Sequence, residues 1–159
     1  MRAVVQRVAQ ARVEVDGAVV GQLAGPGLVA FVGVTHGDGP TEVSWLARKI
    51  AELRIFPGAS GGDGGGDDDG ERSPGREISL LEADLPVLLI SQFTLYGDVR
   101  KGRRPSWSAA ASGPIAEPLV EAVADALRSR GVAVATGTFG AHMMVHLVND
   151  GPVTLVLEV

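Results

Sequence analysis

The chain has 159 residues, a formal net charge of −5 at pH 7 and no cysteine. These values favour one domain over residues 1–159 and exclude disulfide bonds, thiol nucleophiles and thiolate metal sites. No apolar run approaches the roughly 20 residues of a membrane-spanning helix, and the acidic balance argues against a broad DNA-binding face. We therefore expect a cytoplasmic protein with no membrane or DNA partner.

The N-terminal part of the chain predicts β-strands. Asp16-Gly17 is a typical hairpin turn between two short runs in which apolar and polar side chains alternate. A later run is continuously apolar, which indicates a strand buried on both faces. The expected strands cover residues 1–8, 11–15, 18–23 and 28–34.

A helix is predicted next, because apolar side chains recur at helical spacing. These side chains are Val43, Leu46, Ile50 and Leu53. Either Asp38 or Thr41 is expected to cap the N-terminus of this helix. Residues 53–56 then return to an extended conformation.

Residues 58–75 form a low-complexity segment rich in glycine and aspartate. It holds five acidic side chains against one arginine and no apolar side chain larger than alanine. Such a segment cannot offset its ordering entropy by burial, so we predict a mobile surface loop.

The second half of the chain begins with a strand predicted over residues 85–94. This strand is apolar on both faces and then polar at Ser91, Gln92 and Thr94, which is typical of a strand whose tip lines a site. Residues 98–105 follow as a basic loop.

A second helix and further strands complete the chain. Pro118 suits the first turn of the helix, with Val120, Val123 and Leu127 facing inward. Strands are expected over residues 132–135, 143–148 and 153–158. The whole pattern predicts an α+β fold of mostly antiparallel, β-rich sheets with two covering helices.

Gly151-Pro152 stands between the last two predicted strands and has two interpretations. Proline lacks a backbone donor and should not occupy a paired central strand. Asp150-Gly151 therefore favours a hairpin turn stiffened by Pro152. The alternative is a rigid backbone element that directs carbonyl oxygens at a ligand.

The chemical inventory excludes several catalyst classes. His142 and His146 are four residues apart, which on a strand separates them by roughly 13 Å, too far to share one metal ion. The Gly-x-Ser-x-Gly elbow, the phosphate-binding loop and the dinucleotide fingerprint are absent. Ser91 and Thr94 are candidate hydroxyl groups, but both also fit a polar strand end. We expect no metal and no cofactor.

Two motifs carry a resemblance to a known family. Ser91-Gln92-Phe93-Thr94-Leu95-Tyr96 and Asn149-Asp150-Gly151-Pro152-Val153-Thr154 closely resemble the paired motifs of the D-aminoacyl-tRNA deacylases, also called D-tyrosyl-tRNA deacylases. Two long motifs in the right order make the match specific. The similarity extends to residues 1–8, 33–38, 53–56, 101–106 and 139–141.

This resemblance implies a compact, barrel-like homodimer that hydrolyses the ester between a D-amino acid and the 3′-terminal adenosine of tRNA. It implies that a cis Gly151-Pro152 bond enters the partner's pocket, excludes L side chains and admits glycine, so that glycyl-tRNA is also cleaved. Catalysis would involve Gln92, Phe93 and Thr94, and Ser91 would contact the substrate. Whether Thr94 or the ribose 2′-hydroxyl activates the reaction stays open. Contacts to tRNA are expected from Arg100, Lys101, Arg103 and Arg104.

The chain departs from the family pattern in several places. Its 58–75 segment is longer than usual, residues 76–79 differ, His142 replaces a common aspartate and Trp107 a common phenylalanine. Two other functions remain open: a non-catalytic RNA- or nucleotide-binding dimer, and a hydrolase of small D-amino acid esters.

Overall fold

A computed structural model describes residues 1–58 and 76–159. The loop predicted over residues 58–75 lies, apart from Gly58, outside the described residues. In chain order the elements are β1 (Arg2–Val15), β2 (Ala18–Leu23), β3 (Gly27–Gly33), α1 (Pro40–Glu52), β4 (Arg54–Pro57), β5 (Glu77–Ser79), β6 (Val87–Ser91), the 3-10 helix η1 (Phe93–Tyr96), α2 (Gly113–Arg128), β7 (Val134–Thr136) and β8 (Met144–Glu158).

The main sheet is organised around β1. Its strand order is β2-β1-β3-β6-β7, and β8 pairs with the other edge of β1. The three pairings of β1 are antiparallel, whereas β3–β6 and β6–β7 are parallel. The long β1 strand pairs with β3 through its first half and with β2 through its second, after the predicted Asp16-Gly17 hairpin. Strands β4 and β5 form a separate two-stranded sheet.

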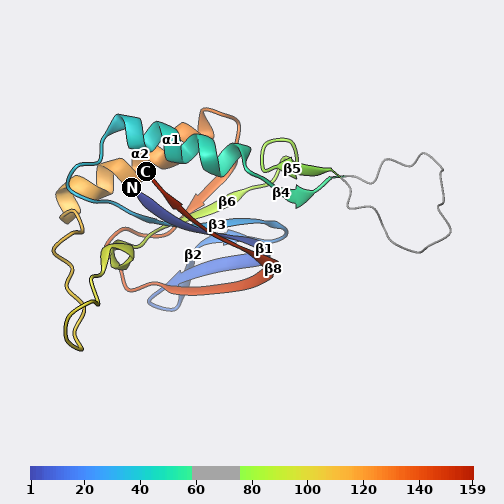
Figure 1. Ribbon diagram of the computed structural model, residues 1–159. Helices are drawn as coiled ribbons and strands as arrows, with labels where there is room; N and C mark the ends of the chain where they lie inside the picture. Colours follow the sequence, from blue (N-terminus) through green and yellow to red (C-terminus); the bar gives the residue numbers. More distant parts are fainter. Residues whose placement is uncertain (59–75) are drawn as a thin grey trace, which may run out of the picture.

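The sheet curls until β2 and β7, the two ends of its strand order, approach each other. A Cβ atom on Gly21 of β2 would lie only 2.4 Å from the carbonyl oxygen of Thr136 in β7, so glycine is required for this close approach. The two helices lie together on one side of the strands (Figure 1). The expected α+β fold, barrel-like and covered by two helices, is therefore confirmed.

Two apolar layers lie on opposite faces of the central strands. In β6, Val87 and Leu89 belong to the layer beneath the helices, whereas Leu88 and Ile90 belong to the layer inside the barrel. This alternation explains why the β6 sequence is apolar on both faces. The predicted stripe of α1 packs into the first layer through Val43, Leu46 and Ile50. Within the described residues, neither helix is long and apolar enough to cross a membrane.

Both predicted helix starts were wrong. Gly39, rather than Asp38 or Thr41, caps α1, and its N–H donates to the Glu42 carboxylate at 2.9 Å. Helix α2 begins at Gly113, with Pro114 in its first turn, and Pro118 lies inside the helix. The earlier start brings Ala116 into the buried layer beneath the helices, a tertiary contact that local proline preference does not report.

Of the two interpretations of the Gly151-Pro152 stretch, the hairpin was wrong. Strand β8 runs from Met144 to Glu158 without reversing, and its residues before and after Gly151-Pro152 both pair with β1. Gln6 pairs with Thr154 and Val8 with Asn149, so residues 150–153 lie opposite the single residue Arg7. The Gly-Pro pair therefore occupies a bulge on an edge strand, where a missing N–H is tolerated.

Candidate functional site

The polar tip after β6 is a tight turn rather than the end of a strand. Prediction extended the strand to Thr94, but β6 ends at Ser91 and residues 93–96 form η1. The Gln92 N–H still donates to the Val32 carbonyl at 2.7 Å before the chain turns. A Cβ atom on Gly33 would lie 3.0 Å from the Gln92 carbonyl oxygen, so glycine at the end of β3 lets the turn pack closely.

A cavity of about 500 Å³ opens beside this turn. It lies between the end of β6, the first turns of α2 and the segment from Phe139 to Met143. Of the predicted catalytic and substrate-binding residues in the motif after β6, Ser91, Gln92 and Phe93 line the cavity, whereas Thr94 does not. The Thr94 hydroxyl instead accepts a hydrogen bond from the Gln92 side-chain amide.

The cavity wall is mostly apolar. Val32, Ile90, Ala116 and Val145 contribute to it, and among the lining residues His142 is the one ionisable side chain. His142 enters the wall after a turn at Gly140, whose φ of +72° favours glycine. In the described part of the chain, no three His, Asp or Glu side chains group closely enough to hold a metal ion.

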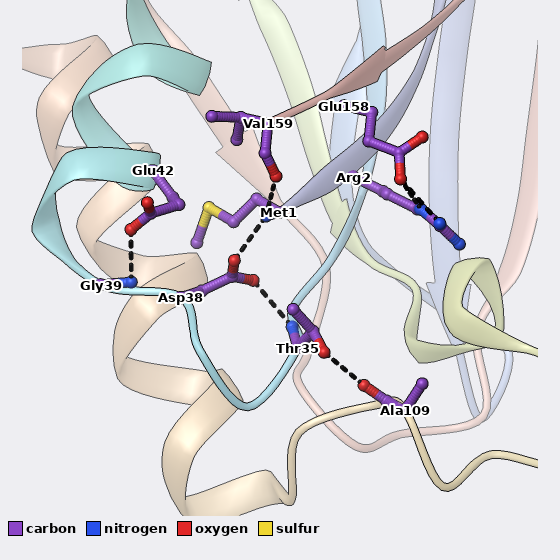
Figure 2. Close-up of polar contacts among 9 residues, drawn as sticks. All are labelled: Met1, Arg2, Thr35, Asp38, Gly39, Glu42, Ala109, Glu158 and Val159. Atoms are coloured by element: carbon purple, nitrogen blue, oxygen red, sulfur yellow. Dashed lines mark hydrogen bonds and ion pairs between the residues drawn. The ribbon is translucent and has the colours of Figure 1, made fainter.

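Ala110 and Ala111 line the cavity, and we call the segment 109–111 its outer wall. Hydrogen bonds anchor this outer wall to the N-terminus (Figure 2). The Thr35 hydroxyl donates to the Ala109 carbonyl at 2.6 Å, and the Ala111 N–H donates to the Val34 carbonyl at 2.9 Å. The Thr35 N–H donates to Asp38 at 2.7 Å, and the other carboxylate oxygen of Asp38 lies 2.5 Å from the α-ammonium group of Met1. Asp38 therefore stabilises this wall instead of capping α1.

Gly151 and Pro152 do not line this cavity. Both are exposed, and the peptide bond that joins them is cis. Arg7 holds the start of the bulge: its Nε atom donates to the Asp150 carbonyl at 3.1 Å and lies 2.9 Å from the Asp150 carboxylate. The Asn149 amide donates to the carbonyl oxygens of Arg7 at 2.8 Å and of Val153 at 3.2 Å.

Arg7 was missed by sequence reasoning. Its side chain is only 16% exposed and also donates to the Ile55 carbonyl. The available signal was the position of Arg7 between Val5 and Val8, in a strand expected to pack on a core. Both valines are fully buried in the structure. Such an arginine needs buried partners, but its partners 48 and 143 residues away are not visible in the local pattern.

The four predicted basic residues are not equivalent. Backbone hydrogen bonds between Asp98 and Ser106 close their loop. Arg100 forms two side-chain hydrogen bonds to Asp98, at 2.9 and 2.7 Å, and these bonds hold the pKa of Asp98 well below its usual range. Lys101, Arg103 and Arg104 are exposed and form no ion pair with another described residue.

Comparisons with known proteins agree over almost the whole chain. The family described as D-Tyr-tRNA(Tyr) deacylase matches residues 4–158. The chain is 59% identical to the D-aminoacyl-tRNA deacylase of Beutenbergia cavernae and 55% identical to that of Kineococcus radiotolerans, each comparison covering 99% of both chains.

Solved structures show the same fold. A structure titled c-Myc DNA unwinding element binding protein superposes with a TM-score of 0.85 at 33% identity, covering 100% of this chain and 99% of the other. A probable eukaryotic D-amino acid tRNA deacylase superposes with a TM-score of 0.77 at 19% identity, covering 99% of this chain and 98% of the other. The latter likeness concerns the fold alone.

Proposed function

Since the chain belongs to the D-Tyr-tRNA(Tyr) deacylase family, we propose that the cavity beside η1 binds the terminal adenosine of tRNA and its attached D-amino acid. The family match confirms the family resemblance that the two motifs carried. The enzyme is a hydrolase with D-aminoacyl-tRNA deacylase activity, a proofreading step in translation. The observation that carries the proposal is the cavity itself, which gathers Ser91, Gln92 and Phe93 at the tip of β6.

The proposed chemistry is attack of water on the ester carbonyl, which breaks the bond to the ribose oxygen and yields a free amino acid and tRNA. The N–H groups of Phe93 and Thr94 open η1, so they have no intrahelical acceptor. We assign the N–H of Phe93, which lines the cavity, to the oxyanion that develops on the carbonyl. Gln92 orients this turn through its bond to Thr94.

Activation of the water is assigned to the ribose 2′-hydroxyl of the substrate. Thr94 is a weaker candidate for a covalent nucleophile, because it lies outside the cavity lining and its hydroxyl accepts a hydrogen bond from an amide. A nucleophilic threonine needs a neighbouring base, and the amide of Gln92 is not one. Water activated by the substrate itself fits a wall that contains His142 as its one ionisable side chain.

Chiral selection is assigned to Gly151 and Pro152 of a second subunit. The pair is exposed on edge strand β8 and absent from the lining of its own cavity, so a role at the ester requires another copy of the chain. The same strand exposes Met144, Val148 and Val156, an apolar face that suits a homodimer interface. The backbone carbonyls of Gly151 and Pro152, in a bulge held by Arg7 and Asn149, would bind the amino group rigidly.

This geometry predicts the range of substrates. A pocket that excludes an L side chain by backbone contact still admits glycine, so glycyl-tRNA is a substrate as well as D-aminoacyl-tRNA. Lys101, Arg103 and Arg104 are assigned to tRNA phosphates, and Arg100, already bound to Asp98, contributes less. We place the reaction in the cytoplasm, where translation supplies the substrate, and treat residues 1–159 as one deacylase domain.

The test is single-turnover hydrolysis of D-Tyr-tRNA, L-Tyr-tRNA and Gly-tRNA by metal-free protein. We expect rapid release of D-tyrosine and glycine, with the L ester spared. Tight tRNA binding without hydrolysis would contradict the proposal and favour a binding protein. Equal hydrolysis of both tyrosyl esters would contradict the chiral role of Gly151-Pro152.

A further inference from the structure

Two aromatic side chains stand exposed at the mouth of the cavity. Phe93 is 55% exposed and Trp107 is 42% exposed, although rings of this size usually bury most of their surface. Their ring centroids lie 5.3 Å apart with an interplanar angle of 75°, an edge-to-face pair. Both residues line the cavity, so the exposed ring surface continues directly from the site of the ester.

The position of Trp107 is fixed by its neighbours. A Cβ atom on Gly97 would lie 2.5 Å from Cζ3 of Trp107, so the indole packs directly on the backbone of Gly97. The Trp107 backbone is fixed too, because its carbonyl accepts a hydrogen bond from the Ala110 N–H at 3.0 Å, within the segment anchored to Thr35. The ring is therefore held in place while part of its surface stays in water.

Positive charge lies next to this ring in the chain. Lys101, Arg103 and Arg104 belong to the loop closed by the Asp98–Ser106 pairing, and Trp107 follows that pairing directly. These three side chains are exposed and form no ion pair with other described residues. Aromatic side chains beside exposed cations are the combination by which proteins bind single-stranded nucleic acid, with bases stacked on the rings and phosphates near the charges.

We propose that Trp107, supported by Phe93, stacks on the base of the nucleotide that precedes the terminal adenosine of the tRNA. Lys101, Arg103 and Arg104 take phosphates of the same strand. This inference rests on the proposed function of the cavity. A cavity of about 500 Å³ has the size of a site for one small ligand, so it holds the aminoacyl adenosine and the preceding nucleotide lies at the mouth.

The kinetic test compares two substrates of different length, 3′-O-(D-tyrosyl)adenosine and D-Tyr-tRNA. For Trp107→Ala, we expect kcat/KM on D-Tyr-tRNA to fall on the order of tenfold, in keeping with alanine replacement of a stacking ring. The aminoacyl adenosine lacks the stacked nucleotide, so its kcat/KM should fall by a clearly smaller factor than that of D-Tyr-tRNA. Trp107→Phe retains a ring and should keep most activity on both substrates.

Two outcomes would overturn the inference. An equal loss on both substrates would mean that Trp107 acts on the adenosine or supports the fold, and no loss on either would mean that it stacks on nothing. Failure of the proposed function would look different, because the wild-type enzyme would then cleave neither ester.

A binding measurement gives an answer independent of catalysis. Trp45→Phe leaves Trp107 as the one tryptophan of the chain, which has two. In that variant, the trinucleotide CCA should quench the fluorescence of Trp107, and adenosine alone should leave it nearly unchanged. Absence of quenching by saturating CCA would overturn the stacking role, whatever the enzyme hydrolyses.

Discussion

The α-ammonium group of Met1 lies 2.5 Å from a carboxylate oxygen of Asp38, and the two side chains are 0% and 4% exposed. The ammonium group also donates to the Val159 carbonyl at 3.2 Å. The second carboxylate oxygen of Asp38 accepts the N–H of Thr35, whose hydroxyl binds the outer wall of the cavity. One buried ion pair thus links the first strand, the last strand and the site.

Asp38→Asn should destabilise the protein by about 3–5 kcal/mol, because it leaves a buried ammonium group without its counter-ion. Chemical denaturation monitored by circular dichroism measures this change. Asp125→Asn is the matched control: Asp125 pairs with Arg128 on the exposed surface of α2 and should change the free energy of unfolding by less than about 1 kcal/mol. Equal effects of the two substitutions would contradict the structural role of Asp38.

Arg7→Lys should lower the single-turnover rate on D-Tyr-tRNA about 10- to 100-fold, because small displacements of a positioned group have effects of that order. Lysine keeps the charge but cannot donate in the several directions that the Asp150 and Ile55 contacts require. Arg12→Lys, on the same strand but 49% exposed beside Glu14, is the control and should leave the rate unchanged. A normal rate for Arg7→Lys would show that the bulge does not depend on this arginine.

Gly151→Ala should reduce hydrolysis of D-Tyr-tRNA on the order of tenfold or more. The added Cβ would lie 3.1 Å from the Asn149 side-chain oxygen, so the Asn149 amide that braces the bulge must move by a few tenths of an ångström. Catalysis is sensitive to small displacements of positioning groups. Gly25→Ala is the control, since its added Cβ meets no atom within 4 Å. The measurement is the rate ratio for D- and L-Tyr-tRNA; an unchanged ratio and rate would remove Gly151 from the site.

Mixing two defective variants tests the proposed sharing of the site between subunits. Gln92→Ala damages the cavity and Gly151→Ala damages the bulge, so a mixed dimer contains one site with neither change. After subunit exchange at equal concentrations, about a quarter of the sites should be intact, and activity should rise toward that fraction. Activity that stays at the level of the separate variants would place both elements in one subunit.

The native phenol of Tyr96 should titrate near pH 12 instead of 10. Burial raises the pKa of Tyr96 to about 12, assisted by the Asp38 carboxylate and opposed by the Arg2 cation. Tyr96 is the chain's one tyrosine, so near-ultraviolet absorbance of tyrosinate reports it alone.

The same shift sets the direction of alkaline unfolding. Because the folded pKa is the higher one, the contribution of Tyr96 to stability is fully present below about pH 10 and is lost as the pH rises through about 12. Tyr96→Phe should make the free energy of unfolding less dependent on pH in this range. A native midpoint near 10 would contradict burial of the phenol.

Local patterns predicted the elements whose stability is local. The Asp16-Gly17 turn has the positive φ angles of 50° and 79° expected of such a hairpin. Val43, Leu46 and Ile50 of the predicted stripe are buried, whereas Leu53 follows the end of α1 and is half-buried. Ser91 and Gln92, expected as part of the polar tip of a strand, line the cavity. Short-range chemistry was sufficient for these features, whereas Phe93 was expected from the family resemblance and Thr94, also expected at the tip, lies outside the lining.

Features that depend on distant partners were not predictable in the same way. Gly151-Pro152 favours a hairpin locally, but pairing with β1 on both sides of it keeps β8 continuous. Asp38 is a good helix cap locally, but a buried ammonium group competes for its carboxylate. In each case a tertiary interaction outweighed a local preference of about 1 kcal/mol.

The pairing of β1 with β8 also determines when the fold can be completed. Arg2 binds Glu158 across 156 residues of sequence, so one whole edge of β1 stays open until the last strand has left the ribosome. Contacts of such long sequence separation form late and slowly. The nascent chain therefore exposes an unpaired strand edge throughout synthesis, and a chain stopped before Met144 should be a substrate for chaperones and proteases rather than a partly active enzyme.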